Sequence, residues 1–293
     1  MSLPPRAPVR PGIPLRAVVP NAVTALALCF GLSGIRFAIT AEWDKAIMFI
    51  FIAAILDGLD GRIARLLRGQ SKFGAELDSL SDVVAFGVAP ALITYLWVLQ
   101  YSHSPGWNTY GWIFALAYAV CMALRLARFN ARIDAEDQPH KSAGFLTGVP
   151  APMGAAIMLL PIVLWLASDG QWTWLRDHRL VAGWSTLSAF LIISSIATFS
   201  MGALRLRRSV RLEAVVIITL VGAGLIVAPW GTMSALAFVY LCTIPLSVMR
   251  YAAVKRRRAR QAAGEPVLPL TPPLAPVPPT AAARQRRSPP DAP

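Results

Sequence analysis

The chain alternates long apolar segments with short polar ones, and this pattern predicts its elements. Eight apolar segments each come near the ~20 residues that an α-helix needs to cross a bilayer. In lipid a helix satisfies its own backbone hydrogen bonds, so these segments predict an all-α, polytopic membrane protein. We place them at residues 19–39, 45–66, 79–100, 110–130, 148–168, 181–200, 212–228 and 231–250.

The two ends of the chain differ from its apolar centre. Residues 1–17 form a basic, proline-rich segment with too few apolar residues for a packed core. Residues 252–293 begin with a basic run and continue as a Pro- and Ala-rich sequence, which predicts a disordered tail. The basic run either fixes the orientation of the last span or attracts anionic lipid headgroups.

The composition supports a membrane protein and argues against nucleic acid as a partner. Hydrophobic residues make up 56% of the chain and charged residues only 15%, whereas soluble domains carry about 25% charge. The net charge of +13 comes from Lys and Arg at the ends of apolar segments rather than along a groove. With the N-terminus inside, 24 of the 28 Lys and Arg residues fall on the inner side. The positive-inside rule therefore predicts a multi-pass protein of the inner cell membrane with both termini and the stretch 57–82 at the cytoplasmic face.

Four aspartates in this stretch are the candidate metal-binding and catalytic residues. Asp57 and Asp60 are three residues apart, and Asp78 and Asp82 are four apart, so each pair shares one helix face. A carboxylate at membrane depth costs about 2.5–3.5 kcal/mol, so four of them need a compensating charge. Divalent cations prefer oxygen ligands, and the aspartates therefore predict one or two Mg²⁺ or Mn²⁺ ions.

Other residues of the same stretch suit a phosphate substrate. Metal ions that share carboxylates clamp the oxygens of a diphosphate. Arg65 can bind phosphate through two parallel hydrogen bonds, and Gly61 and Gly74 let a nucleotide lie against the backbone. A lipid can enter such a site from the bilayer while a polar acceptor enters from water. These features together indicate phospholipid synthesis.

The spacing of this stretch resembles the signature of the CDP-alcohol phosphotransferase family. That signature is D-x2-D-G-x2-A-R-x8-G-x3-D-x3-D, and the chain matches it at all eight positions, namely Asp57, Asp60, Gly61, Ala64, Arg65, Gly74, Asp78 and Asp82. The resemblance covers about residues 18–200 and implies the six-helix core of that family. Residues 201–251 would then add two transmembrane helices, and the family likeness also implies a homodimer.

The resemblance also implies roles for individual residues. Asp57, Asp60 and Asp78 would hold metal, and Asp82 would bind a second ion and act as general base on the acceptor hydroxyl. The CDP-lipid would contact the remaining candidates, which are Asn21, Thr24, Gly61, Ala64, Arg65, Ser71 and Gly74.

Asn21 and Thr24 belong to this set because residues 20–24 read P-N-A-V-T and are similar to the P-N-x-x-T opening of the family's first span. Their alternative reading is local: Asn21 caps a helix, or Thr24 bonds to its own helix.

Two further segments address the acceptor. Residues 125–130 (R-L-A-R-F-N) and 145–155 (F-L-T-G-V-P-A-P-M-G-A) resemble the phosphatidylserine synthases of this superfamily, with Val149 in place of the usual Leu. The likeness implies CDP-diacylglycerol and L-serine as substrates, and phosphatidylserine and CMP as products. The acceptor's carboxylate could be held near the cytoplasmic end of the fourth segment, by Arg125, Arg128, Asn130, Lys141 and Ser142. Ordinary positive-inside anchoring is the alternative reading of these arginines.

Two other functions stay open. The same chemistry could use another acceptor, such as glycerol 3-phosphate, inositol, inositol phosphate or choline. A cation-coupled membrane transporter could use the aspartates as an ion site, and it predicts metal-linked flux without release of CMP.

Overall fold

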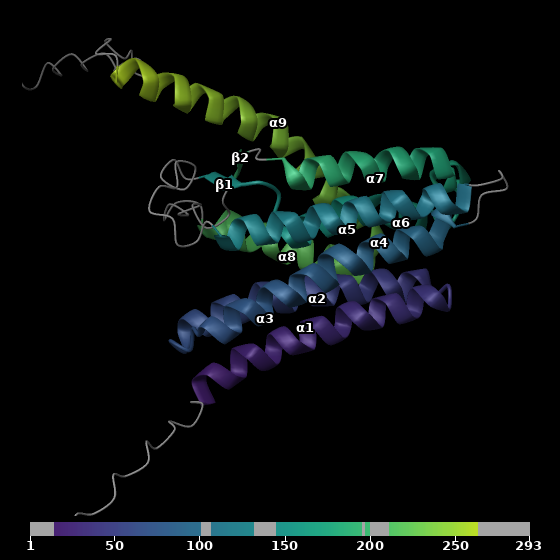
Figure 1. Cartoon of the computed structure of the whole chain (residues 1–293), viewed down its shortest axis with the longest axis horizontal. Helices are drawn as coiled ribbons and strands as arrows, with labels where there is room; N and C mark the ends of the chain where they lie inside the picture. The colour runs from purple at the N-terminus through teal and green to yellow at the C-terminus, as the bar shows by residue number, and fades with distance from the viewer. Residues whose placement is uncertain (1–14, 101–106, 132–144, 195–196, 200–210, 263–293) are drawn as a thin grey trace, which may run out of the picture. The chain divides into compact units, whose positions relative to one another are not determined.

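A computed structural model describes residues 15–100, 107–131, 145–194, 197–199 and 211–262 (Figure 1). The described part is almost entirely helical, which confirms the all-α prediction. The helices are α1 (Leu15–Ile39), α2 (Trp43–Leu66), α3 (Lys72–Asp82), α4 (Ala89–Thr94), α5 (Trp107–Ala131), α6 (Ala151–Ala167), α7 (His178–Ile193), α8 (Arg211–Val227) and α9 (Pro229–Ala262). The sequence pattern did not predict one feature, an antiparallel pair of short strands, β1 (Phe145–Thr147) and β2 (Ala197–Phe199), with Leu146 opposite Thr198.

Each of the eight predicted segments contains a helix, but several boundaries were wrong. The third helix begins at Lys72 rather than at 79, and the sixth ends at Ile193 rather than at 200. The last helix runs on to Ala262, so residues 252–262 are helical where a disordered tail was expected. The reason is that this segment consists mostly of Ala, Lys and Arg, which are strong helix formers. Residues 263–293 lie outside the described part of the chain.

The chain is a multi-pass membrane protein. Within the described residues, four helical segments are long and apolar enough to cross a membrane: Val18–Ile39, Lys72–Leu99, Tyr110–Ala131 and Pro229–Arg250. Helices α6, α7 and α8 are apolar but shorter, at 17, 16 and 17 residues. Helix α2 is long enough but carries charged residues in its second half. That all eight helices cross the bilayer stays a prediction.

The chain divides into two units, Met1–Met249 and Arg250–Pro293. The first unit holds the helices that build the core, and the described part of the second is the last portion of α9. The predicted boundary between a core at 18–200 and two added helices at 201–251 falls beside residues 200–210, which lie outside the described residues. That division stays a prediction.

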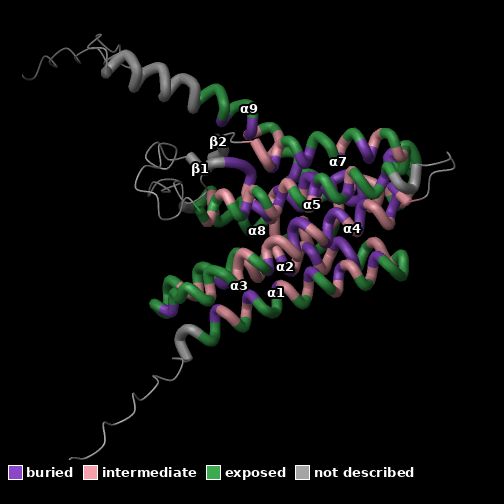
Figure 2. The backbone as a smooth tube through the Cα atoms, viewed as in Figure 1, coloured by how far each residue is buried: buried purple, intermediate pink, exposed green. Residues whose placement is uncertain are grey.

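Small residues let α1 pack closely against its neighbours. A Cβ on Gly31 would come within 2.8 Å of the Ala85 Cα, and one on Gly34 within 3.1 Å of the Ala46 carbonyl oxygen. The core of the first unit is a cluster of buried residues on α1, α2, α4, α5, α6, α7 and the helical turn after α4, with Trp97 and Tyr118 among its largest fully buried side chains. Figure 2 shows buried and intermediate residues along these helices.

Helix α3 continues into α4 through a π-helical turn, Val83–Val88, and a second such turn, Tyr95–Leu99, extends the helix to Leu99. Pro90 lies in the first turn of α4, and Phe86 lies in the π-helical turn before it. The hydroxyl group of Tyr118 on α5 donates to the Phe86 carbonyl at 3.1 Å and so joins α5 to this turn.

An aromatic donor also joins α7 to α6. Pro161 cannot donate to the carbonyl of Ile157, and Trp184 Nε1 on α7 donates to that oxygen at 2.7 Å. Trp184 thus bonds a carbonyl that a proline leaves without its usual helical partner.

Candidate active site

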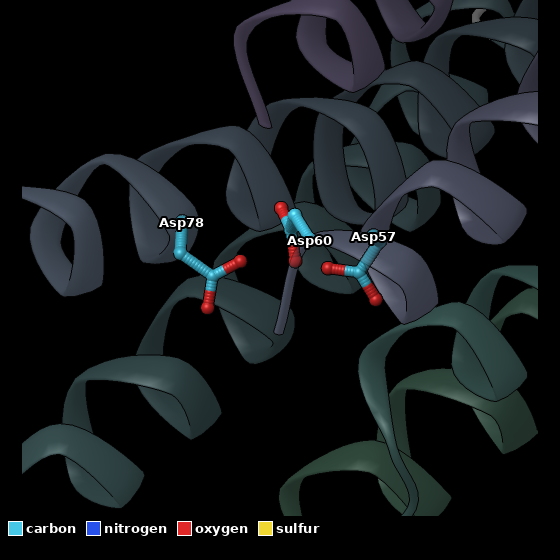
Figure 3. A group of neighbouring side chains, drawn as sticks. All are labelled: Asp57, Asp60 and Asp78. Carbon is cyan, nitrogen blue, oxygen red and sulfur yellow. The ribbon is translucent and has the colours of Figure 1, made fainter. Parts of the chain in front are cut away.

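The aspartates come from α2 and α3, two helices that both pack against α1. Asp57 and Asp60 lie on α2, and Asp78 lies on α3, four residues before Asp82 at the end of that helix. Asp57, Asp60 and Asp78 each offer a carboxylate oxygen, and these three atoms lie within 4.8 Å of one another (Figure 3). Helical spacing predicted each pair on one face, and the packing of α2 and α3 against α1 brings Asp57, Asp60 and Asp78 together.

Thr24 on α1 fixes the orientation of Asp60. Both side chains are buried, and Thr24 Oγ1 donates to Asp60 Oδ2 at 2.5 Å. The same hydroxyl group lies 3.1 Å from the carbonyl oxygen of Pro20, one turn earlier in α1. Thr24 therefore both bonds within its own helix and contacts Asp60, while its contact with a CDP-lipid stays a prediction. Ser81 Oγ also donates to the Thr24 carbonyl at 3.3 Å, which ties α3 to α1.

Asp82 lies beside this group of three. Its carboxyl group is within hydrogen-bonding range of Asp57 and interacts electrostatically with Asp78 and Arg125. Among the described residues, the group whose oxygens meet within 4.8 Å contains Asp57, Asp60 and Asp78 but not Asp82. A role for Asp82 as metal ligand or general base stays a prediction.

The donor set fits a divalent cation. Three carboxylates from two helices supply the hard oxygen ligands that Mg²⁺ and Mn²⁺ prefer. Within the described residues none of the four aspartates forms an ion pair with Lys or Arg. Buried like charges without such pairing are unfavourable, and a bound cation would neutralise them.

A cavity of about 590 Å³ opens on one side of the aspartates, and we call it the larger cavity. Helices α1, α2 and α3 and the turn between α2 and α3 supply most of its wall. All seven residues predicted to contact a CDP-lipid line it: Asn21, Thr24, Gly61, Ala64, Arg65, Ser71 and Gly74.

Local contacts explain several of these residue types. Ser71 caps α3 and accepts a hydrogen bond from the Gly74 N–H at 3.0 Å. A Cβ on Gly74 would lie 2.7 Å from Asn21 Oδ1, so glycine permits the close approach of α1. A Cβ on Gly61, by contrast, would meet no side chain or neighbouring element of the described residues within 4 Å. Arg65 Nε donates to the Gly61 carbonyl at 3.0 Å, which holds the guanidinium beside the cavity.

A second cavity, of about 300 Å³, lies on the other side of the carboxylates, and we call it the smaller cavity. All four aspartates line it, together with Arg125 and the connection from β1 to α6. The two cavities share four lining residues, which are Asp60, Gly61, Asp78 and Phe129. The carboxylates therefore stand at the boundary between two compartments, as a transfer between two bound substrates requires.

The five candidates for acceptor contacts lie in different places. Arg125 lines the smaller cavity. Arg128 Nη2 donates to the Ile193 carbonyl at 2.6 Å, at the end of α7, and Asn130 Nδ2 donates to Ser79 Oγ at 2.8 Å on α3. Lys141 and Ser142 lie outside the described residues. The structure thus places one described candidate, Arg125, among the residues that line the smaller cavity.

Sequence reasoning missed Phe129 as a site residue, although it lines both cavities. Phe129 follows Arg125 by four residues, which puts both side chains on the same face of α5. That spacing was a usable signal. Gly148 and Pro150 also line the smaller cavity, and Pro150 precedes the first turn of α6 as a helix entry.

Helices at membrane depth, a carboxylate cluster suited to a metal ion and two adjoining cavities define a membrane-embedded, metal-dependent transferase. The sequence profile of the CDP-alcohol phosphatidyltransferase family matches residues 17–198, and a second profile, CDP-alcohol phosphatidyltransferase 2, matches residues 210–245. The chain belongs to the CDP-alcohol phosphatidyltransferase family, which confirms the resemblance seen in the aspartate stretch.

Relatives with assigned activities carry a common name. The CDP-diacylglycerol--serine O-phosphatidyltransferase of Mycobacterium tuberculosis (strain ATCC 25618 / H37Rv) is 38% identical over 240 residues, which cover 82% of this chain and 80% of the relative. The protein of that name from Helicobacter pylori (strain J99 / ATCC 700824) is 37% identical over 181 residues, 60% of this chain and 70% of its own. The protein of that name from Bacillus subtilis (strain 168) is 33% identical over 161 residues, 52% of this chain and 82% of its own.

Proposed function

We propose that the protein transfers the phosphatidyl group of CDP-diacylglycerol to the hydroxyl group of L-serine, giving phosphatidylserine and CMP. The observation that carries the proposal is the carboxylate cluster shared by two cavities, each lined by a different set of candidate residues. The names of the relatives support serine as the acceptor.

The larger cavity would receive the CDP part of the lipid substrate. Arg65 stands beside it as a phosphate ligand, because a guanidinium binds phosphate oxygens through two parallel hydrogen bonds. Gly61 leaves room inside the cavity, and the partly buried Asn21 and the hydroxyl group of Ser71 offer polar contacts to the nucleotide. The diacylglycerol part would remain in the surrounding membrane lipid.

Asp57, Asp60 and Asp78 would hold Mg²⁺ or Mn²⁺, with Asp82 as a further ligand if two ions bind. A bound ion supplies positive charge at the diphosphate, which favours departure of CMP. Thr24 keeps Asp60 oriented for this role through its hydrogen bond to Oδ2.

The acceptor would enter the smaller cavity, where Asp82 lies next to Asp57. Asp82 takes the proton of the serine hydroxyl group as that oxygen forms a bond to the lipid-side phosphorus of CDP-diacylglycerol. The bond from that phosphorus to the bridging oxygen breaks, and the oxygen leaves with CMP. Holding both substrates at the shared carboxylates makes the reaction effectively unimolecular.

The proposal also includes the membrane, the orientation and the oligomeric state of the enzyme. The distribution of Lys and Arg supports an inner-membrane protein with its termini and site toward the cytoplasm, where soluble CMP and serine are found. The family likeness supports a homodimer.

The test is an acceptor screen with purified protein in detergent, CDP-diacylglycerol and Mg²⁺ or Mn²⁺. CMP release is measured with serine, glycerol 3-phosphate, inositol, inositol phosphate or choline, one at a time. We expect release with serine, and loss of that activity by about 10²–10⁴-fold in Asp82→Asn, the range associated with a general base. Asp44→Asn is the matched control, because Asp44 lies in the first turn of α2 and is not among the residues that line either cavity.

Each other outcome has a definite meaning. CMP release with an acceptor other than serine would keep the chemistry and overturn the choice of acceptor. Flux of Mn²⁺ into proteoliposomes without any CMP release would contradict the transferase proposal and favour cation transport. Full activity of Asp82→Asn would remove Asp82 from the role of general base.

A further inference from the structure

Arg125 lines the smaller cavity. Among the described residues that line this cavity it is the only Lys or Arg, and it faces a wall that carries four aspartates. Its Nε and Nη1 atoms are buried and meet no hydrogen-bond acceptor within the described part of the chain. A buried guanidinium with unused donors is unfavourable, so these donors indicate a ligand with acceptor oxygens.

Neighbouring groups fix Arg125 without using those donors. Gly148 has φ +83°, and a Cβ there would lie 3.9 Å from Arg125 Nε, so the connection to α6 passes close to the guanidinium. Tyr118, two turns earlier on α5, gives its hydroxyl proton to the Phe86 carbonyl. Val149, the residue after Gly148, belongs to a buried cluster that packs against Tyr240 of α9.

Tyr240 is itself held in place by packing. It lies against a small buried cluster formed by Val149, Ile157 and Ile244, which joins α9 to α6 and to the residue that follows Gly148. Helix α9 therefore packs against the connection that passes close to Arg125. This helix lies beyond residues 17–198, the part of the chain that matches the first family profile.

Resting on the proposed function, we propose that Arg125 binds the carboxylate of an amino-acid acceptor and that Tyr240 of α9 positions Arg125 for this task. Arg125 would thereby determine which acceptors react. Arg128 has a different role, since its guanidinium bonds the end of α7.

The charge pattern of the cavity selects a zwitterion. A carboxylate at Arg125 and an ammonium group near the aspartates would each meet the opposite charge. Choline and inositol offer no anion to Arg125. Glycerol 3-phosphate offers Arg125 a phosphate in place of a carboxylate and brings no cation to the aspartates, so it matches this pattern less well.

The test compares serine with ethanolamine, which keeps the hydroxyl and ammonium groups but lacks the carboxylate. In the wild type we expect serine to be strongly preferred. In Arg125→Gln we expect the KM for serine to rise about 10- to 100-fold, because a charge-assisted contact is lost. The preference for serine over ethanolamine should fall by a similar factor, and the KM for CDP-diacylglycerol should change by less than about twofold.

Tyr240→Ala tests the contribution of α9, because it removes the side chain that packs against the cluster containing Val149. We expect the KM for serine to rise several-fold, with the same fall in preference over ethanolamine, because Arg125 is less well held. Matched controls are Arg62→Gln and Tyr110→Ala, since both residues are exposed and neither is among those lining the cavities. Arg125→Lys, which keeps the charge, serves as the second variant if Arg125→Gln does not fold.

The outcomes separate this inference from the proposed function. If the wild type fails to release CMP with every acceptor tested, the proposed function is wrong. If the wild type uses serine but the variants keep both its KM and its preference over ethanolamine, the proposed function stands and the role of Arg125 is wrong. A change in the KM for CDP-diacylglycerol alone would place Arg125 on the lipid substrate and also overturn the inference.

Discussion

The glycines of the aspartate stretch have different structural roles. Gly74 permits contact between helices, because a Cβ there would collide with Asn21. Gly58 and Gly61 both lie in α2 and both have space around them, but only Gly61 is among the residues that line the cavities. The space at Gly61 is therefore space for a ligand.

Gly61→Ala should weaken substrate binding without lowering the stability of the fold. In a helix interior, Ala is more stable than Gly by roughly 0.5–1 kcal/mol, so the variant should unfold at the same or higher temperature. The added methyl group enters both cavities, and we expect the KM for CDP-diacylglycerol to rise about tenfold or more, equivalent to about 1.4 kcal/mol. Steady-state kinetics and thermal unfolding in detergent provide the measurements.

Gly58→Ala is the matched control for that change. It makes the same substitution on the same helix and should give the same gain in stability without a change in KM. Equal effects of both substitutions on KM would mean that the methyl group acts through the helix rather than inside the cavities.

At the scale of elements, two hydrogen bonds from aromatic side chains join neighbouring helices. Tyr118 bonds the Phe86 carbonyl in the π-helical turn after α3, and Trp184 bonds the Ile157 carbonyl that Pro161 leaves without its usual helical partner. Such bonds join α5 to the helix that follows Asp82, and α7 to α6. The long helix that carries Asp78 and Asp82 is thus held against α5, which carries Arg125.

Tyr118→Phe should weaken this join. The change removes only the hydroxyl group of a fully buried side chain and leaves the Phe86 carbonyl without that donor. We expect a loss of about 1–3 kcal/mol in the free energy of unfolding, the cost of leaving a buried polar group unsatisfied. Unfolding in mixed detergent micelles measures it, with the exposed Tyr110→Phe as control. An unchanged unfolding free energy would show that the bond adds nothing net.

At the scale of the whole molecule, the carboxylates that form the site lower the stability of the metal-free fold. Four carboxylates gather between helices of a membrane protein, and among the described residues no Lys or Arg forms an ion pair with any of them. Like charges in such a setting destabilise the metal-free protein, and a cation that binds only the folded state stabilises it.

Asp78→Asn should therefore change stability in opposite directions with and without metal. Without metal, the variant should unfold at a higher temperature than the wild type, because one negative charge is gone from the cluster. On addition of Mn²⁺ the wild type should gain stability, whereas the variant should gain little. Thermal unfolding with EDTA or with Mn²⁺ tests both halves. A metal-dependent gain that is equal in the two proteins would place the ion elsewhere.

Asp44→Asn is the control at this scale as well. It also removes one carboxylate from the chain, but Asp44 lies at the start of α2, away from the group formed by Asp57, Asp60 and Asp78. We expect it to keep the full response to Mn²⁺.

The sequence by itself determined the apolar segments, the all-α class and the eight spaced residues of the aspartate stretch. Those features depend on local composition and on the spacing of residues within one helix, and both can be read directly from the sequence. It also identified seven residues that prove to line one cavity. Boundaries such as the end of α9 at Ala262 were missed, because the last turns combine basic charge with high helix propensity.

Only the tertiary structure decided how these residues divide between two cavities. Arg125 and Arg128 are three residues apart and look equivalent in sequence, but one lines the smaller cavity and the other bonds the end of α7. The contribution of Tyr240 likewise depends on α9 packing against α6. Spacing fixes which face of its own helix a side chain occupies, whereas its partners are set by contacts between helices distant in sequence.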